Sequence, residues 1–330
     1  MSSNPLVISP LEILNQSTAS GMGYSYWKNF RKCGAYQWYN LKHPRVELTQ
    51  LRAPEPGEKV NMTEVGIFFH KLRELWRLDI LDSPEDVVVE WGGDFEPDEW
   101  KTACRLFEFY VKTFSRDEWL TVSCEELLEV GCINCATYKH GGFCPDALTV
   151  WSVHCGSVTV HIKLCSKAIA CLEHFGVPCL SGRMDELAFI DEEQLTKLNS
   201  APRYLGLFDP GFYQIDAKTK KQKYKNLDIQ YQELIQFTSY QELWNYLNPD
   251  KTVRGMIADS LFPYVKGPVS DSQLITNNPH KIAVMKDFYS KCWQEYVLYG
   301  FRTNKECCFD FNKTCYWLTS KECNGLDPVT

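Results

Sequence analysis

Cysteine and histidine residues gather between Cys132 and Cys179, a segment of 48 residues that holds seven of the 15 cysteines and four of the seven histidines. Thiolate and imidazole groups are ligands that zinc prefers in proteins. Cys132 and Cys135 form a Cys-x2-Cys pair. Four ligands at tetrahedral angles stabilise a fold and keep their thiolates unreactive, so the sequence predicts a structural zinc site here.

The other ligand candidates lie downstream of this pair. They are Cys144, His154, Cys155 and Cys165, which join Cys135 as candidates. His154 and Cys155 would point to opposite faces of a regular strand, so they can bind one ion only if a turn lies there. The alternative is that these cysteines are buried free thiols, which pack as small hydrophobic side chains.

Motifs of the common enzyme classes are absent from the sequence. It contains no G-x-x-x-x-G-K-[S/T] loop, no G-x-S-x-G and no H-E-x-x-H. Cys171-x-Glu173 followed by Pro178-Cys179 matches part of a zinc deaminase motif, but the spacing is too short. We therefore predict no catalytic residues. A zinc-dependent hydrolase or deaminase is the alternative, and it would need a metal with an open coordination position beside an acid.

Charge and hydropathy limit the partners of the chain. The net charge of −7 argues against nonspecific duplex binding by the whole surface, and we expect no sequence-specific nucleic acid partner. The one basic run comprises Lys218, Lys220, Lys221, Lys223 and Lys225. We interpret this run as a solvated loop, with a nuclear-localisation signal or a phosphate-binding patch as alternatives. No apolar stretch approaches the roughly 20 residues that span a bilayer, and the N-terminus lacks a secretory pattern, so we expect a reducing compartment.

A four-residue spacing predicts an interaction motif next to the cysteines. Leu128, Cys132 and Ala136 would share one face of a helix. They spell L-x3-C-x3-A, the core of the box by which substrate receptors bind elongin C. Leu120, Cys124 and Leu128 spell the same core in an overlapping frame. The alternative is an ordinary amphipathic core helix.

Hydrophobic periodicity predicts the elements that position these residues. Three-to-four spacing predicts helices over residues 63–81, 97–114, 123–136, 231–247 and 281–299. Alternation predicts a strand at 87–91 and a hairpin of 148–154 with 158–164. We expect residues 201–226 to be a loop. The expected fold is α+β, with mixed helices and antiparallel hairpins around a Cys/His-rich, zinc-stabilised core.

Three regions follow from this pattern. Residues 1–95 form an N-terminal aromatic and helical region, and residues 96–200 form the Cys/His-rich core with the candidate elongin-binding helix and hairpin. Residues 201–330 form a C-terminal helical region with a second cysteine cluster that includes Cys307 and Cys308.

The order of residues in the Cys/His-rich core resembles that of the adenovirus early-region-4 34-kilodalton protein family. The matching residues are Cys132, Cys135, Ala136, Trp151, Val153, His154, Cys155 and Cys165, approached by the acidic-leucine run Glu125-Glu126-Leu127-Leu128. The likeness covers residues 124–165, roughly an eighth of the chain. The sequence departs from the family in one respect, because we find no arginine-rich amphipathic helix of the kind that the family has near its C-terminus.

The resemblance implies a viral adaptor in the host nucleus and cytoplasm, not an enzyme. Such an adaptor recruits elongin B, elongin C, a cullin and the ring-box protein, and with the early-region-1B 55-kilodalton protein it directs host proteins to degradation and favours viral late mRNA export. It implies zinc ligands at Cys135, His154, Cys155 and Cys165, and an elongin-binding face at Leu128, Cys132 and Ala136. Because one residue should not do both, we assign Cys132 to the helix face. A metal-free structural interaction protein is a further alternative.

Overall fold

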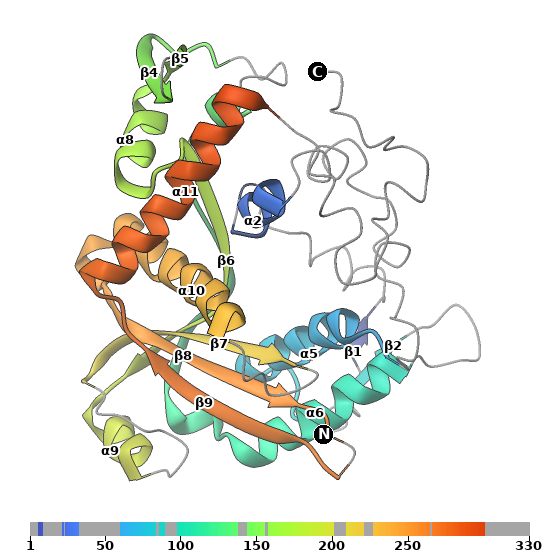
Figure 1. Ribbon diagram of the computed structural model, residues 1–330. Helices are drawn as coiled ribbons and strands as arrows, with labels where there is room; N and C mark the ends of the chain where they lie inside the picture. Colours follow the sequence, from blue (N-terminus) through green and yellow to red (C-terminus); the bar gives the residue numbers. More distant parts are fainter. Residues whose placement is uncertain are drawn as a thin grey trace.

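The chain forms an α+β fold (Figure 1). The computed structural model describes residues 6–8, 22, 24–32, 60–83, 86–89, 98–137, 144–155, 158–200, 209–220, 227–264 and 266–300. The predicted cluster at Cys307 and Cys308 lies outside these residues. No helix among the described residues is both long enough and apolar enough to cross a membrane.

A five-stranded mixed sheet occupies the centre of the molecule, in the order β3-β6-β7-β8-β9. Its strands are β3 (Leu120–Gly131), β6 (Cys179–Ile190), β7 (Gly211–Thr219), β8 (Val253–Phe262) and β9 (Val269–Ile275). Neighbouring strands are antiparallel except β7 and β8, which are parallel. Because parallel neighbours need a long crossover, the helix α10 (Leu227–Leu247) connects β7 to β8.

Helices cover the sheet (Figure 1). The helices α5 (Met62–Arg77) and α6 (Asp98–Thr113) pack on each other, and their apolar residues share a buried cluster with Ala217 of β7 and Leu261 of β8. The helix α11 (Pro279–Tyr299) packs against α10 and against the short helix α2 (Tyr24–Lys32). Trp27 of α2 meets Trp293 of α11 edge to face, with 6.4 Å between ring centroids.

A smaller unit is inserted between β3 and β6, at the upper end of the molecule in Figure 1. It consists of the short helix α7 (Ile133–Ala136), the hairpin of β4 (Thr149–Cys155) with β5 (Val158–Leu164), and the helix α8 (Ser166–Phe175). The remaining elements are β1 (Leu6–Ile8), which pairs with β2 (Val87–Val89), the helix α9 (Glu192–Ser200), and the 3-10 turns η2 (Arg116–Glu118) and η4 (Pro249–Lys251).

Most of the expected elements are present. The α+β class, the hairpin, the strand near residue 87 and the helices α5, α6, α10 and α11 are confirmed, with bounds within a few residues of those predicted.

Two expectations were wrong. The helix expected over residues 123–136 is the strand β3 followed by α7. Exposed and buried side chains alternate in the second half of β3. Leu127, for example, is 51% exposed, whereas Leu128 is 2% exposed. This alternation is typical of a strand with one buried face, and pairing with β6 along its length stabilises it. The loop expected over residues 201–226 contains β7, which has sheet partners on both sides.

The sheet crosses the regional boundary that we placed after residue 200. Its strands β3 and β6 precede that boundary, and β7, β8 and β9 follow it. The three predicted regions describe the composition of the sequence and do not coincide with the sheet. The division into regions stays a prediction.

Candidate metal centres

Four cysteines converge at the junction of the inserted unit with β3. We call Cys132, Cys135, Cys144 and Cys165 the cysteine cluster. Their Sγ atoms all lie within 4.8 Å of one another, with 3.8 Å from Cys132 to Cys144 and 3.6 Å from Cys135 to Cys165. These sulfurs are not joined in disulfides. Zinc–sulfur bonds of about 2.3 Å at tetrahedral angles place sulfur atoms about 3.8 Å apart, so the cluster could hold one metal ion.

Four elements bring these sulfurs together. Cys132 directly follows β3, where its N–H donates to the carbonyl of Pro178 at 2.9 Å, and Cys135 lies in α7. Cys144 precedes the hairpin, and Cys165 precedes the first turn of α8 and donates its N–H to Cys135 Sγ at 3.4 Å. A metal ion here would tie the end of β3, the hairpin and α8 into one unit.

Burial controls protonation in the cysteine cluster. It raises the pKa of Cys132 and Cys135, which favours neutral thiols. Burial also opposes ionisation of Cys165, but the N–H of Ala168 and the neighbouring thiols outweigh it and lower the pKa of Cys165. A bound cation would supply the charge that the buried thiolates lack.

The cluster differs from the predicted ligand set in two ways. It includes Cys135, Cys144 and Cys165 as expected, but its fourth member is Cys132, which we had assigned to a helix face. His154, also expected as a ligand, is not a member of the cluster. It is exposed on β4, and its Nδ1 lies 3.0 Å from Thr159 Oγ1 across the hairpin. The strand there is regular, so no turn directs His154 toward the sulfurs. The side chain of Cys155 lies outside the described residues.

The expected elongin-binding face is not formed. Leu128 is buried in the core from β3, and Ala136 is buried in α7, so the two do not share a helix. In the overlapping frame, Leu120 is 59% exposed and Cys124 half-buried, both on β3. The four-residue spacing here coincides with a strand, because pairing with β6 overrides the local pattern.

A second convergence of ligand-type side chains lies where α5 meets the sheet. His70 of α5, Glu125 of β3 and Asp185 of β6 offer atoms that all lie within 4.8 Å of one another. His70 Nδ1 is 3.3 Å from Asp185 Oδ2 and 4.0 Å from Glu125 Oε1. Together with Asp216 and Lys218 of β7, we call these residues the acidic cluster.

Strand β7 adds a buried carboxylate and a lysine to this group. Lys218 Nζ lies 2.8 Å from Asp216 Oδ1, and the N–H of Ala217 between them donates to Asp185 Oδ2 at 3.2 Å. Asp216 is 1% exposed, and its Oδ2 has no hydrogen-bond partner among the described residues. Buried polar atoms nearly always have a hydrogen-bond partner in native proteins, so we expect a water or an ion to bind this oxygen.

Burial and the nearness of other carboxylates disfavour ionised acids in the acidic cluster. Burial, reinforced by Asp185, raises the pKa of Glu125 to about 8 and also raises the pKa of Asp216. Burial and the nearby Lys218 ammonium lower the pKa of His70 to about 3, so its imidazole is neutral and able to bind a metal. The acids outweigh burial at Lys218 and raise its pKa, so the lysine stays charged.

Backbone strain accompanies this arrangement. Glu125 has a φ of 52°, in the left-handed region that residues with side chains seldom adopt. Strain of this kind persists where the surrounding structure enforces it, and it often occurs at functional sites.

The acidic cluster was not predicted from the sequence, although β7 carries a signal for it. Apolar Tyr213, Ile215 and Ala217 alternate with polar residues along this strand, which is the pattern of a strand with one apolar face. We interpreted Lys218 as part of a solvated basic loop, which was wrong, since this lysine pairs with a buried carboxylate. The Pro210-Gly211 pair and the flanking lysines are typical of a loop, so we did not recognise the alternation between them.

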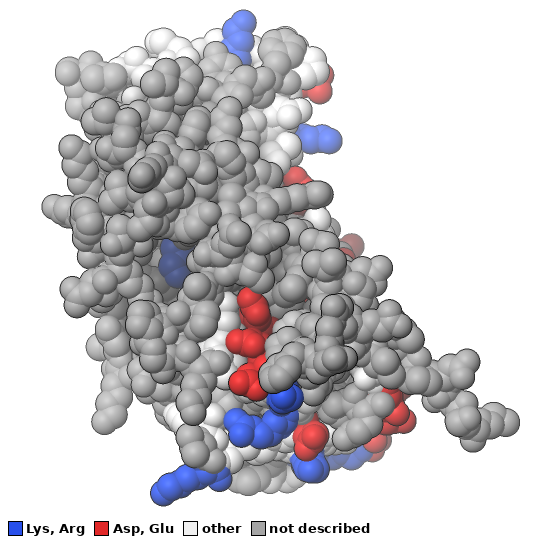
Figure 2. Space-filling model, turned by 90° about the vertical axis from the view of Figure 1, so that its right-hand side faces the viewer, with Lys and Arg blue, Asp and Glu red and all other residues white. Residues whose placement is uncertain are grey.

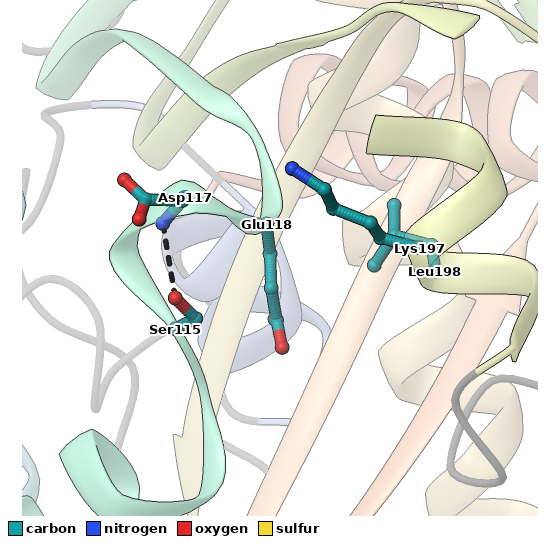
Figure 3. A pocket seen from close by; sticks show the side chains of 5 residues that line it. All are labelled: Ser115, Asp117, Glu118, Lys197 and Leu198. Atoms are coloured by element: carbon teal, nitrogen blue, oxygen red, sulfur yellow. Dashed lines mark hydrogen bonds between the residues drawn. The ribbon is translucent and has the colours of Figure 1, made fainter. Parts of the chain in front are cut away.

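Other surface features lie apart from both clusters. A hollow of about 320 Å³ lies between η2 and α9 (Figure 3). It is lined by Ser115, Asp117, Glu118, Lys197 and Leu198, none of which belongs to either cluster. Figure 2 shows acidic side chains gathered near the middle of one face, with lysine and arginine side chains close to them.

Comparison with known proteins gives little guidance. No family model matches the chain, and no curated protein matches it. A crystal structure of a candidate exonuclease from Eubacterium rectale has a TM-score of 0.40 and 11% sequence identity, and the match covers 96% of this chain and 92% of that one. Likeness at this level carries no argument about fold or function.

Proposed function

We propose that this chain is a divalent-cation-dependent phosphodiesterase, with the acidic cluster as its active site. Asp216 carries the proposal. It is a carboxylate only 1% exposed, with an oxygen that no described residue pairs, close to the Asp185 carboxylate and the His70 imidazole. Burying a carboxylate oxygen without a hydrogen-bond donor costs free energy, so we expect a cation or a water to bind this oxygen.

The ligand types favour magnesium or manganese at this position. Carboxylate oxygens with a single imidazole suit these harder cations, whereas the four sulfurs of the cysteine cluster suit zinc. His70, Glu125 and Asp185, whose ligand atoms lie within 4.8 Å of one another, would hold the cation, with Asp216 close to Asp185 and His70. Three monodentate ligands of an octahedral ion leave positions open for water and substrate, which a closed structural site does not offer.

The chemistry follows from the groups present. A bound cation supplies Lewis acidity and lowers the pKa of a bound water. The five residues of the acidic cluster include no hydroxyl or thiol nucleophile, so water is the attacking group. Lys218 donates hydrogen bonds from a charged ammonium that Asp216 holds in place, and it offsets negative charge that develops on the phosphoryl oxygens. Magnesium sites built from few carboxylates typically bind substrate phosphates, which favours a phosphodiester over a peptide substrate.

The proposal is tested by incubating the purified protein with end-labelled single- and double-stranded DNA and RNA. We expect cleavage with Mg²⁺ or Mn²⁺, none with EDTA, and loss of cleavage in Asp216→Asn and Lys218→Met. Lys167→Met, an exposed change on α8, is the matched control and should retain activity. Cleavage that persists in EDTA or in Asp216→Asn would refute the proposal.

We also propose that the cysteine cluster binds one structural Zn²⁺. Its support is the sulfur–sulfur spacing of 3.6 and 3.8 Å and the absence of disulfides within the cluster. A closed four-sulfur site has no open position for substrate, so this metal would stabilise the inserted unit rather than take part in the reaction.

Recruitment of elongin B, elongin C, a cullin, the ring-box protein and the early-region-1B 55-kilodalton protein stays a prediction of the resemblance, as does residence in the host nucleus and cytoplasm. The order of cysteines and Trp151 supports this prediction, but β3 replaces the helix on which elongin binding depended. Affinity purification of the tagged protein from cells, followed by protein identification, tests it, and absence of elongin C would refute it.

A further inference from the structure

A second network of buried charges lies directly beside the acidic cluster. Its centre is the carboxylate of Glu186, which is fully buried. Oε1 accepts hydrogen bonds from Trp119 Nε1 at 2.8 Å and from Thr121 Oγ1 at 2.7 Å. Oε2 forms an ion pair with Arg73, and Arg77 Nε lies 3.5 Å from it. Both oxygens of this carboxylate are therefore paired.

The two arginines are enclosed by aromatic rings. Arg73 Nε and Arg77 donate to the hydroxyl of Tyr110 at 3.1 and 3.3 Å. The guanidinium of Arg77 lies 4.6 Å from the ring centre of Trp76 and 4.5 Å from that of Trp119. This packing holds both side chains of α5 in single positions.

A buried charge network of this kind fixes the position of a helix on a sheet more than it raises the free energy of unfolding. Replacing a buried ion pair by well-packed apolar side chains is often neutral or stabilising, because desolvation offsets the attraction between the charges. Apolar contacts, however, leave a helix free to shift or rotate slightly on a sheet, whereas directed bonds fix where it lies. His70, Arg73 and Arg77 occupy positions i, i+3 and i+7 of α5, which fall on one helix face.

The register that this network fixes determines where His70 falls. His70 lies one turn before Arg73, and its Nδ1 is 3.3 Å from Asp185, the residue that immediately precedes Glu186 on β6. Anchoring Arg73 and Arg77 to Glu186 thus places the imidazole against the neighbouring carboxylate.

We infer that Glu186 is a positioning residue, which fixes α5 on β6 through Arg73 and Arg77 and so holds His70 in the acidic cluster. This inference rests on the proposed function, because it assumes that the acidic cluster binds a divalent cation. Glu186 itself touches neither the cation position nor substrate, since its oxygens are engaged by the four groups of the network.

The test is a double-mutant cycle read out as Mn²⁺ affinity, measured by titration calorimetry on the full chain. Outer partners of metal ligands typically change affinity by 10- to 100-fold, so we expect Glu186→Gln to weaken Mn²⁺ binding about tenfold. His70→Ala should weaken it at least as much. The double variant should bind no more weakly than His70→Ala, because Glu186 acts only through the imidazole. Losses that add in the double variant, or unchanged affinity in Glu186→Gln, would overturn the inference.

A matched control separates positioning from general destabilisation. Asp259 of β8 is another buried carboxylate, which accepts a hydrogen bond from Ser272 at 2.6 Å. Asp259→Asn should lower the melting temperature and leave Mn²⁺ affinity unchanged, and a loss of affinity there would count against the inference.

A milder variant covers the case in which Glu186→Gln does not fold. Thr121→Val removes one hydrogen bond from the carboxylate and keeps the charges. We expect a smaller loss of Mn²⁺ affinity that is absent in the His70→Ala background, and an additive loss would overturn the inference. A wild-type chain that binds no Mn²⁺ would overturn the proposed function and this inference with it, whereas Mn²⁺ binding with additive losses would overturn the inference alone.

Discussion

Asp185 and Glu186 are consecutive residues of β6, yet their carboxylates have opposite surroundings. Glu186 is fully buried, and although burial alone would raise its pKa, Arg77 and Arg73 outweigh that effect and lower it. Asp185 is partly exposed and lies against a neutral imidazole, with the N–H of Ala217 as its backbone donor. One strand thus supplies a structural anchor, which Arg73 pairs, and a candidate ligand, which His70 contacts.

Asp216→Asn should abolish cleavage. Asp216 is 1% exposed, and its Oδ1 lies 2.8 Å from the Lys218 ammonium. The amide removes the carboxylate charge beside the cation position and leaves this ammonium without its buried counter-charge. Cation affinity or cleavage should therefore fall by more than the roughly 100-fold that outer partners contribute. Calorimetry and the cleavage assay measure both, and the exposed Asp209→Asn is the control that should change neither. An active Asp216→Asn would contradict this account.

Glu125→Gln should change the pH dependence of stability when no cation is present. Burial, with Asp185 and Glu74, raises the pKa of Glu125 from 4.5 to about 8. Between these values the folded state binds one more proton than the unfolded state, so stability falls as pH rises through that window. The glutamine variant lacks this penalty. In EDTA it should therefore be more stable than wild type near pH 8, with the difference vanishing near pH 4.5.

Thermal unfolding at the two pH values measures this effect. Glu129→Gln alters an exposed carboxylate on the same strand and should show no such change. An equal difference between Glu125→Gln and wild type at both pH values would exclude the proposed cause.

Purified protein should contain about one zinc per chain, held by the cysteine cluster. Cys135→Ser should lose the metal and lower the melting temperature, because the end of β3, the hairpin and α8 would no longer be tied together. Cys104→Ser alters a partly buried cysteine of α6 outside the cluster and should keep the metal. Elemental analysis at neutral pH measures the content. Less than about half an equivalent in the wild type would contradict a structural site.

The cysteine cluster was largely predictable because its ligands lie close together in the sequence. Three of its four members were among the candidates, and the hairpin that positions them alternates clearly. Cys132 was left out of the expected ligand set because we predicted a helix around it and assigned its side chain to the elongin-binding face of that helix.

The acidic cluster was not predictable in the same way. His70, Glu125, Asp185 and Asp216 come from four elements that are far apart in the sequence and meet only when the sheet forms. No short motif links them, and each alone is an ordinary polar residue. Their order in space depends on strand pairing, which local periodicity does not encode.

The region of β3 shows how local pattern and pairing can disagree. Ser123 and Glu126 match a helix capping box, and their side chains do bond, with Ser123 Oγ 2.7 Å from Glu126 Oε2. They do so on a strand, however, because β3 pairs with β6. The capping-box pattern is a three-residue spacing, and a hydrogen bond between the two side chains can form at this spacing in a helix or in a strand.

Adjacent leucines on β3 should respond very differently to the same substitution. Leu128 is 2% exposed and packs in the main core, so Leu128→Ser removes buried apolar contacts and leaves a hydroxyl without a partner. We expect it to lower the free energy of unfolding by about 3 kcal/mol. Leu127 is 51% exposed, and Leu127→Ser should change the same quantity by about 0.5 kcal/mol or less. Urea unfolding of both variants measures the difference. Equal losses would contradict a strand with one buried face. Because the expected loss of stability at Leu128 is large, loss of elongin C binding in Leu128→Ser would indicate unfolding rather than the loss of a direct contact.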